Sequence, residues 1–91
     1  MNEFVYVEFL FPAQHAMQLA AEVVALGNDF SLVKSELEWD SEDGNTQGYQ
    51  HIHGKINAET ATALTLSDSF LSKYMRVSYI SDDLKDKYRK R

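Results

Sequence analysis

Apolar residues along the first third of the chain predict a central strand followed by a helix. Residues 3–11 are almost continuously apolar or aromatic, and Glu8 is the one interior charge. Pro12 ends this strand and suits the first turn of a helix, and Gly27 is a good stop. Between them, small and apolar residues recur at helical spacing. The predicted inner face of the helix consists of Ala13, Ala16, Met17, Ala20, Val23, Val24 and Gly27.

Strict alternation over residues 30–40 predicts a second strand with one solvated side, which is typical of a position near a sheet edge. The side expected to face the core carries Val33, Ser35, Leu37 and Trp39. Trp39 is interpreted as a core anchor, since large aromatic side chains bury much apolar area. Residues 41–48 have turn composition and predict a hairpin loop.

The rest of the chain predicts a third strand, a second helix and a last strand. The third strand covers residues 49–56. Asn57 is placed to cap a helix over residues 58–67, with Glu59 in its first turn. Residues 74–80 then form the last strand.

This order of elements predicts an α+β fold, a ferredoxin-like βαββαβ sandwich. Its four-stranded antiparallel sheet has the order 4-1-3-2, and both helices cover one face. Residues 1–81 form this domain. Residues 82–91 form a charged tail or a short final helix, in which Leu84 and Tyr88 lie on one side.

Composition indicates one globular domain and narrows the available chemistry. Of the 91 residues, 44% are apolar and 25% are charged, and none is cysteine. Disulfides and thiolate metal sites are therefore excluded, and a reducing, cytoplasmic compartment is expected. No basic region precedes an apolar run at the N-terminus, so no signal peptide is expected. No apolar stretch approaches the ~20 residues that cross a membrane.

Charge is divided unevenly along the chain, whose net charge is −5. Five basic residues and one acidic residue lie in the last seven, so residues 1–84 carry −9. Such an acidic body repels nucleic-acid phosphates and attracts basic partners. An acidic patch is predicted from Glu36, Glu38, Asp40, Glu42 and Asp43. It is either a solvated strand edge or a contact surface for a basic protein, at the extreme a mimic of nucleic-acid phosphates.

The uncovered face of the predicted sheet is unusually aromatic, which favours a contact surface. We predict an interaction surface of Tyr6, Glu8, Tyr49, His51, His53, Tyr74 and Arg76. Tyrosine and arginine are favoured at the centres of protein interfaces. Homodimerisation through this face is therefore expected.

Two segments resemble the strand motifs of RNA recognition motif domains. Residues 5–10 are similar to the first-strand motif and residues 47–54 to the third-strand motif. The resemblance implies that Tyr6, Tyr49 and His51 stack on the bases of single-stranded RNA. Gln47, Glu8 and Gly54 depart from the family's pattern, and the acidic body disfavours phosphate contacts.

The histidine pair His51 and His53 shares one face of its predicted strand. With Glu8 on a neighbouring strand, the pair supplies chemically sufficient metal ligands. Two half-exposed strand histidines are the simpler interpretation, so no metal, cofactor or catalytic residue is predicted. There is no nucleophile elbow and no glycine-rich phosphate loop, and the chain is not expected to be an enzyme.

The sequence therefore predicts a small acidic protein-interaction module, acting as a regulator, adaptor or inhibitor. Its expected partner is a protein, basic if the acidic patch makes the contact, and the module itself is expected to be a cytoplasmic homodimer. The alternative is a single-stranded RNA-binding domain that uses the aromatic side chains of the open sheet face.

Overall fold

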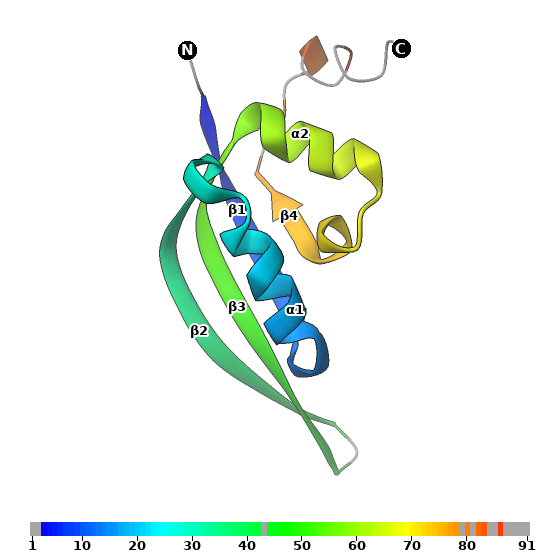
Figure 1. The fold of residues 1–91 in the computed structure, drawn as a ribbon. Coiled ribbons are helices and arrows are strands. Elements are labelled where there is room, and N and C mark those ends of the chain that lie inside the picture. The colour runs from blue at the N-terminus through cyan, green and yellow to red at the C-terminus, as the bar shows by residue number, and fades with distance from the viewer. Residues whose placement is uncertain (1–2, 43, 79, 81, 84–85, 87–91) are drawn as a thin grey trace.

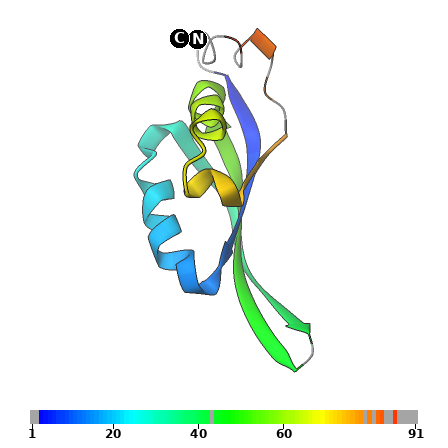
Figure 2. The same ribbon diagram turned by 90° about the vertical axis from the view of Figure 1, so that its right-hand side faces the viewer.

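The computed structural model describes residues 3–42, 44–78, 80, 82–83 and 86, which form one sheet with two helices on one face. The strands are β1 (Phe4–Pro12), β2 (Phe30–Glu42), β3 (Asn45–Asn57) and β4 (Met75–Val77), and the helices are α1 (Ala13–Val24) and α2 (Ala58–Ser67). All strand pairs are antiparallel, in the order β2-β3-β1-β4. Figures 1 and 2 show both helices on the same side of the sheet. The predicted ferredoxin-like α+β fold is confirmed.

Strand β1 lies at the centre of the sheet, as its continuous apolar sequence predicts. It pairs with β3 along its whole length, from Phe4 opposite Asn57 to Pro12 opposite Tyr49. On its other side it pairs with β4. Alternate side chains of β1 face the helices and are fully buried, namely Val7, Phe9 and Phe11. The side chains between them lie on the open face.

The core packs between the sheet and the helices, around Phe9. The Phe9 ring centroid lies 5.4 Å from that of Phe11 and 5.8 Å from that of Phe30. Further buried apolar residues are Leu19 and Val23 of α1, Ile52 and Ile56 of β3, Ala61 of α2, and Leu71. The predicted inner face of α1 was partly wrong, because Met17 and Val24 are exposed whereas Leu19 is buried. Apolar residues occupy two adjoining faces of this helix, and the face that carries Leu19 packs on the sheet.

The β2–β3 hairpin is longer than predicted and projects past α1 (Figure 1). Residues 41–42 and 45–48 belong to strands and not to a loop, because Ser41 pairs with Thr46 and Glu42 with Asn45. A 12-residue helix is about 18 Å long, whereas a 13-residue strand is about 44 Å long. One short helix therefore cannot cover the hairpin. We call the uncovered part, residues 36–42 and 45–49, the β2–β3 arm.

The predicted burial of the second strand is consequently wrong. Val33 is 63% exposed, and Leu37 and Trp39 are each 69% exposed. A bulge between Leu32 and Lys34 shifts the pairing register at Val33. Trp39 is not a core anchor, because it lies beyond the helix. Its ring rests against Gly48, where an added Cβ would lie 2.7 Å from Cζ3 of Trp39.

The second helix has the predicted bounds and the predicted cap. The side-chain oxygen of Asn57 accepts hydrogen bonds from the backbone N–H groups of Glu59, at 2.9 Å, and Thr60, at 3.3 Å. These bonds satisfy two of the four amide groups that a helix start leaves unpaired.

The last strand is shorter than predicted, because β4 contains only three residues. Tyr74 belongs instead to the 3₁₀ turn Leu71–Tyr74 before it. The Tyr74 ring centroid lies 5.5 Å from that of Phe70 and 6.5 Å from that of His15. Packing against the core cluster takes this tyrosine out of the strand.

Most of the predicted charged tail, residues 84–85 and 87–91, lies outside the described residues, as does Tyr79. The predicted final helix therefore stays a prediction. Within the part of the chain that the structure describes, no helix is both long enough and apolar enough to cross a bilayer.

Candidate functional site

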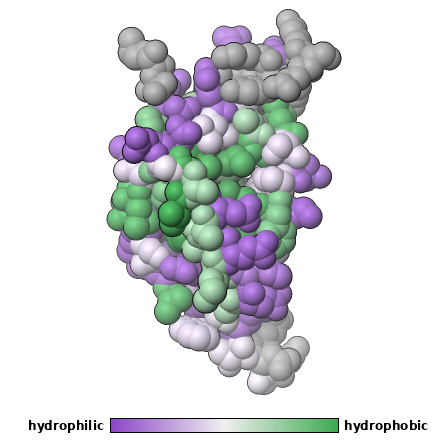
Figure 3. All heavy atoms as spheres, in the orientation of Figure 1, coloured by the Kyte–Doolittle hydropathy of each residue, from purple (hydrophilic) through white to green (hydrophobic). Residues whose placement is uncertain are grey.

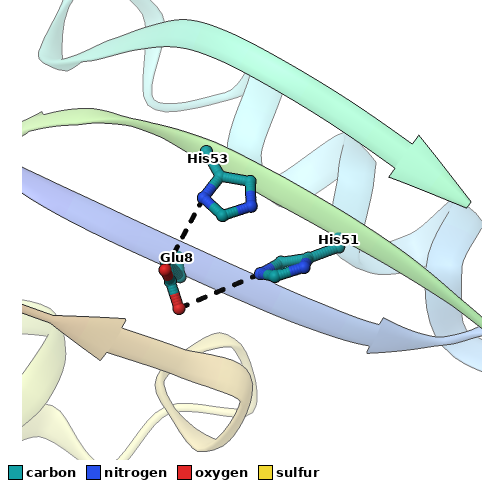
Figure 4. Close-up of side chains that lie close together, drawn as sticks. All are labelled: Glu8, His51 and His53. Atoms are coloured by element: carbon teal, nitrogen blue, oxygen red, sulfur yellow. Dashed lines mark ion pairs between the residues drawn. The ribbon is translucent and has the colours of Figure 1, made fainter. Parts of the chain in front are cut away.

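Three potential metal ligands meet at the centre of the open face (Figure 4). His51 and His53 are two positions apart on β3, so both side chains point to the same side of the sheet. Glu8 of β1 lies directly opposite His53 in the strand register. Because β1 is a central strand and pairs with β3, Glu8 lies beside both histidines.

The distances between these side chains are short but longer than hydrogen bonds. Nδ1 of His53 lies 3.6 Å from Oε1 of Glu8, and Nε2 of His51 lies 3.9 Å from Oε2. The two imidazole ring centroids are 4.0 Å apart, with an angle of 38° between the ring planes. One ligand atom from each of the three residues falls within 4.8 Å of the others.

A second carboxylate holds His51 from the other side. Nδ1 of His51 lies 2.8 Å from Oε1 of Glu38, on β2. An ionised carboxylate only accepts hydrogen bonds, so Nδ1 carries the proton in this contact. In the neutral ring, Nε2 is then the unprotonated nitrogen, and it is the atom nearest to Glu8.

The charges around the cluster come mainly from β2 and β4. Nζ of Lys34 lies 2.8 Å from Oε1 of Glu36. This hydrogen bond, followed by the charge of Lys34, lowers the pKa of Glu36, and the same bond, followed by the charge of Glu36, raises the pKa of Lys34. Arg76 of β4 lies opposite Glu8. A cavity of about 400 Å³ adjoins the cluster, and its lining includes Glu8, His51 and Arg76.

The structure brings together only part of the predicted interaction surface. Glu8, His51, His53 and Arg76 are neighbours on the open face. Tyr6 lies near the start of β1, whereas Tyr49 of β3 pairs with Pro12 at the end of β1. The two tyrosines are therefore far apart. Six strand positions separate them, or about 20 Å. Tyr74 packs against Phe70 and also lines the cavity that Glu8, His51 and Arg76 line, so it is the one predicted tyrosine that lies beside them among the described residues.

The distance between Tyr6 and Tyr49 also affects the residues that were predicted to stack on RNA bases, namely Tyr6, Tyr49 and His51. Tyr6 is 62% exposed, and Nζ of Lys55 lies 5.3 Å from its ring centroid. His51 is held by Glu38, and Tyr49 lies at the far end of the face. The three rings therefore do not form one continuous stacking platform, and RNA binding stays a prediction.

Two residues of the predicted acidic patch contact neighbouring side chains. Glu36 contacts Lys34, Glu38 contacts His51, and Asp40 is exposed. Asp43 and the side chain of Glu42 lie outside the described residues. The contact between Glu38 and His51 was not predicted, because no hairpin register was derived from the sequence. The observed register places Glu36 opposite His51 and Glu38 opposite Tyr49, so Glu38 reaches His51 diagonally.

Compared with protein-family models, curated proteins and solved structures, the chain matches none of them.

Proposed function

We propose that this chain is a small cytoplasmic protein-interaction module, that it acts by binding and not by catalysis, and that it binds a second copy of itself through β2. One observation carries the proposal. Leu37 and Trp39, on the helix side of the β2–β3 arm, are each 69% exposed. Exposed apolar side chains grouped on one surface mark contact sites. A two-stranded ribbon is also marginally stable in water without a covering layer.

A second apolar feature lies beside the arm on the same side of the sheet. A cavity of about 360 Å³ between α1 and β2 is lined largely by apolar side chains, including Val24, Phe30 and Leu32. Figure 3 shows apolar surface gathered over this side of the molecule. The apolar surface therefore extends from α1 across β2 toward the arm.

The backbone edge of β2 makes a second copy the preferred occupant. β2 has 13 residues and lies at one end of the strand order. Among the described residues, no strand pairs with its outer edge. Antiparallel pairing with β2 of a second copy, about a twofold axis, would satisfy these backbone groups and join two four-stranded sheets.

A register centred on Leu37 offers side-chain complementarity for this pairing. With the axis at Leu37, that residue faces its own copy, and Trp39 lies diagonally across from it. Lys34 then faces Asp40 of the second copy, which gives two opposite-charge pairs. This register combines the apolar contact at Leu37 with the two pairs of opposite charge.

Repulsion limits the strength of this dimer and predicts its salt dependence. In the same register Glu36 faces Glu38 of the second copy, and each chain has a net charge of −5. Salt screens repulsion between exposed charges. Dimerisation is therefore expected to strengthen from low to moderate salt. The acidic side of the arm stays open, and a basic partner protein would bind there in a regulatory, adaptor or inhibitory role.

Sedimentation velocity at several concentrations tests the proposal. Leu37→Lys and Trp39→Ser should abolish the dimer, whereas Leu10→Ser, which removes an exposed apolar side chain from the open face, should leave it intact. Lys34→Asp should weaken the dimer, and adding Asp40→Lys should restore it. Circular dichroism verifies that each variant is folded.

A chain that stays monomeric at every salt concentration would refute the homodimer, as would a dimer that is insensitive to Leu37→Lys. A monomer that gains mass with short single-stranded RNA in low salt, and loses it as salt rises, would establish the RNA-binding alternative instead.

A further inference from the structure

We propose that Glu8, His51 and His53 form a binding site for one divalent transition-metal ion, with Zn²⁺ as the ion that fits these donors. The inference goes beyond the proposed self-association and does not rest on it. The three ligands lie at the centre of the open face, whereas Leu37 and Trp39 lie on the other side of the sheet.

Donor chemistry selects the class of ion. Two imidazole nitrogens and one carboxylate oxygen suit Zn²⁺ and its first-row neighbours, whereas Mg²⁺ and Ca²⁺ prefer oxygen donors throughout. Bonds of 2.0–2.1 Å in a tetrahedral site place neighbouring donors about 3.3–3.4 Å apart. Oε1 of Glu8 lies 3.6 Å from His53 and Oε2 lies 3.9 Å from His51, and one donor atom from each residue falls within 4.8 Å of the others. The side chains must therefore move closer to surround one ion, which the half-exposed position of Glu8 permits.

The orientation of His51 is the second, independent observation. Its Nδ1–H donates to Glu38, so the Nε2 lone pair is directed to the side of Glu8. In the neutral form of the ring, this lone pair and a carboxylate oxygen face one another. A cation between these two acceptors removes their repulsion. The contact with Glu38 is also the outer-shell arrangement that orients metal-binding histidines.

Access and local charge also suit a cation. Glu8 is half-exposed and borders the cavity of about 400 Å³, so an ion can enter and a fourth position can hold water. Glu8 and Glu38 contribute two negative charges beside the imidazoles. Arg76, opposite Glu8, opposes the cation and limits its affinity.

Titration of the metal-free full chain with Zn²⁺ in a calorimeter, and with Co²⁺ followed by visible absorption, tests the site. We expect one ion per chain and the intense visible bands of a tetrahedral cobalt site. Glu8→Gln, His51→Ala and His53→Ala should each weaken binding at least tenfold. Circular dichroism and thermal melting verify that these exposed or half-exposed substitutions leave the fold intact.

Two matched controls distinguish a specific metal site from non-specific metal binding by single histidines. Glu36→Gln removes a neighbouring carboxylate that Lys34 already engages, and His15→Asn removes the histidine that packs against Phe70. Both should change affinity less than threefold. No stoichiometric binding by the wild-type chain would overturn the proposal, and so would an equal loss in His15→Asn and His53→Ala. Repeating the titration on Leu37→Lys separates this result from the fate of the dimer, because the site should still bind one ion per chain there.

Discussion

The imidazole of His51 donates a hydrogen bond from Nδ1 to Oε1 of Glu38 across 2.8 Å, which joins the edge strand β2 to the centre of the open face. The two residues are 13 positions apart in sequence and come together only through the hairpin. His51 is the less exposed member, with 20% of its side chain accessible, so its ring is fixed mainly by this bond and by the stacked ring of His53. Glu38 is thus placed to act on Glu8 through His51.

The first prediction concerns Glu38 as a positioning residue. Glu38→Ala should weaken Zn²⁺ binding about 10–100-fold, the usual effect of losing an outer-shell partner. Glu38→Gln keeps an acceptor oxygen and should recover part of this loss. Nitrogen NMR of the metal-free chain should show the Nδ1–H form of His51 in the wild type and a mixture of forms in Glu38→Ala. An unchanged proton distribution would mean that Glu38 does not orient the ring.

The centre of the fold could be read from sequence because local signals and tertiary packing agree there. The run around Phe9 predicted the central strand, and the cap at Asn57 fixed the start of α2. Both depend on residues close together in the chain. Their burial follows from strand alternation and helix geometry alone.

The arm and the site depended on relative lengths, which the local pattern does not specify. Leu37 and Trp39 alternate as core residues do, yet they lie past the end of α1 and remain exposed. The partners of His51 depend on hairpin register, which places Glu36 opposite His51 and brings Glu38 to it diagonally, and local sequence does not specify that register. Short-range periodicity predicts the face of the sheet on which a side chain lies, but not which element covers that face.

The second prediction tests the cap of α2. Asn57→Ala removes the acceptor for the amide groups of Glu59 and Thr60 and should lower the free energy of unfolding by about 1 kcal/mol, up to about 2 kcal/mol. Urea denaturation measures the change. Asn57→Asp retains the acceptor and should cost less than Asn57→Ala. Equal losses in the two variants would show that packing of the buried Asn57 side chain, and not capping, sets its contribution.

The third prediction concerns close packing at Gly54. A Cβ at this position would lie 2.5 Å from the backbone oxygen of Ser31 and 2.6 Å from the ring of Phe30. Because a backbone atom cannot move aside easily, Gly54→Ala should destabilise the protein by about 1–3 kcal/mol. Gly48→Ala is the matched control, since only the outer end of the Trp39 ring opposes it. Thermal melting should show the larger loss for Gly54→Ala, and the opposite order would contradict the packing argument.

The fourth prediction joins the two proposals through charge. Glu38 both orients His51 and, in the proposed dimer, faces Glu36 of the second copy. Binding of Zn²⁺ to Glu8, His51 and His53 adds two positive charges per chain near these acids, which reduces the repulsion between copies. Zinc should therefore strengthen self-association, most in low salt and least where salt already screens the charges. By thermodynamic linkage, the dimer should then bind zinc more tightly than the monomer, by the same factor.

Sedimentation velocity with and without zinc measures this effect. His53→Ala lacks one proposed ligand but keeps the β2 edge, so it should dimerise without responding to zinc. Suppose that the dimer and the zinc site are each established separately, yet the wild type and His53→Ala respond alike to zinc. Zinc would then act on the dimer from another site, and the electrostatic link through Glu38 would be wrong.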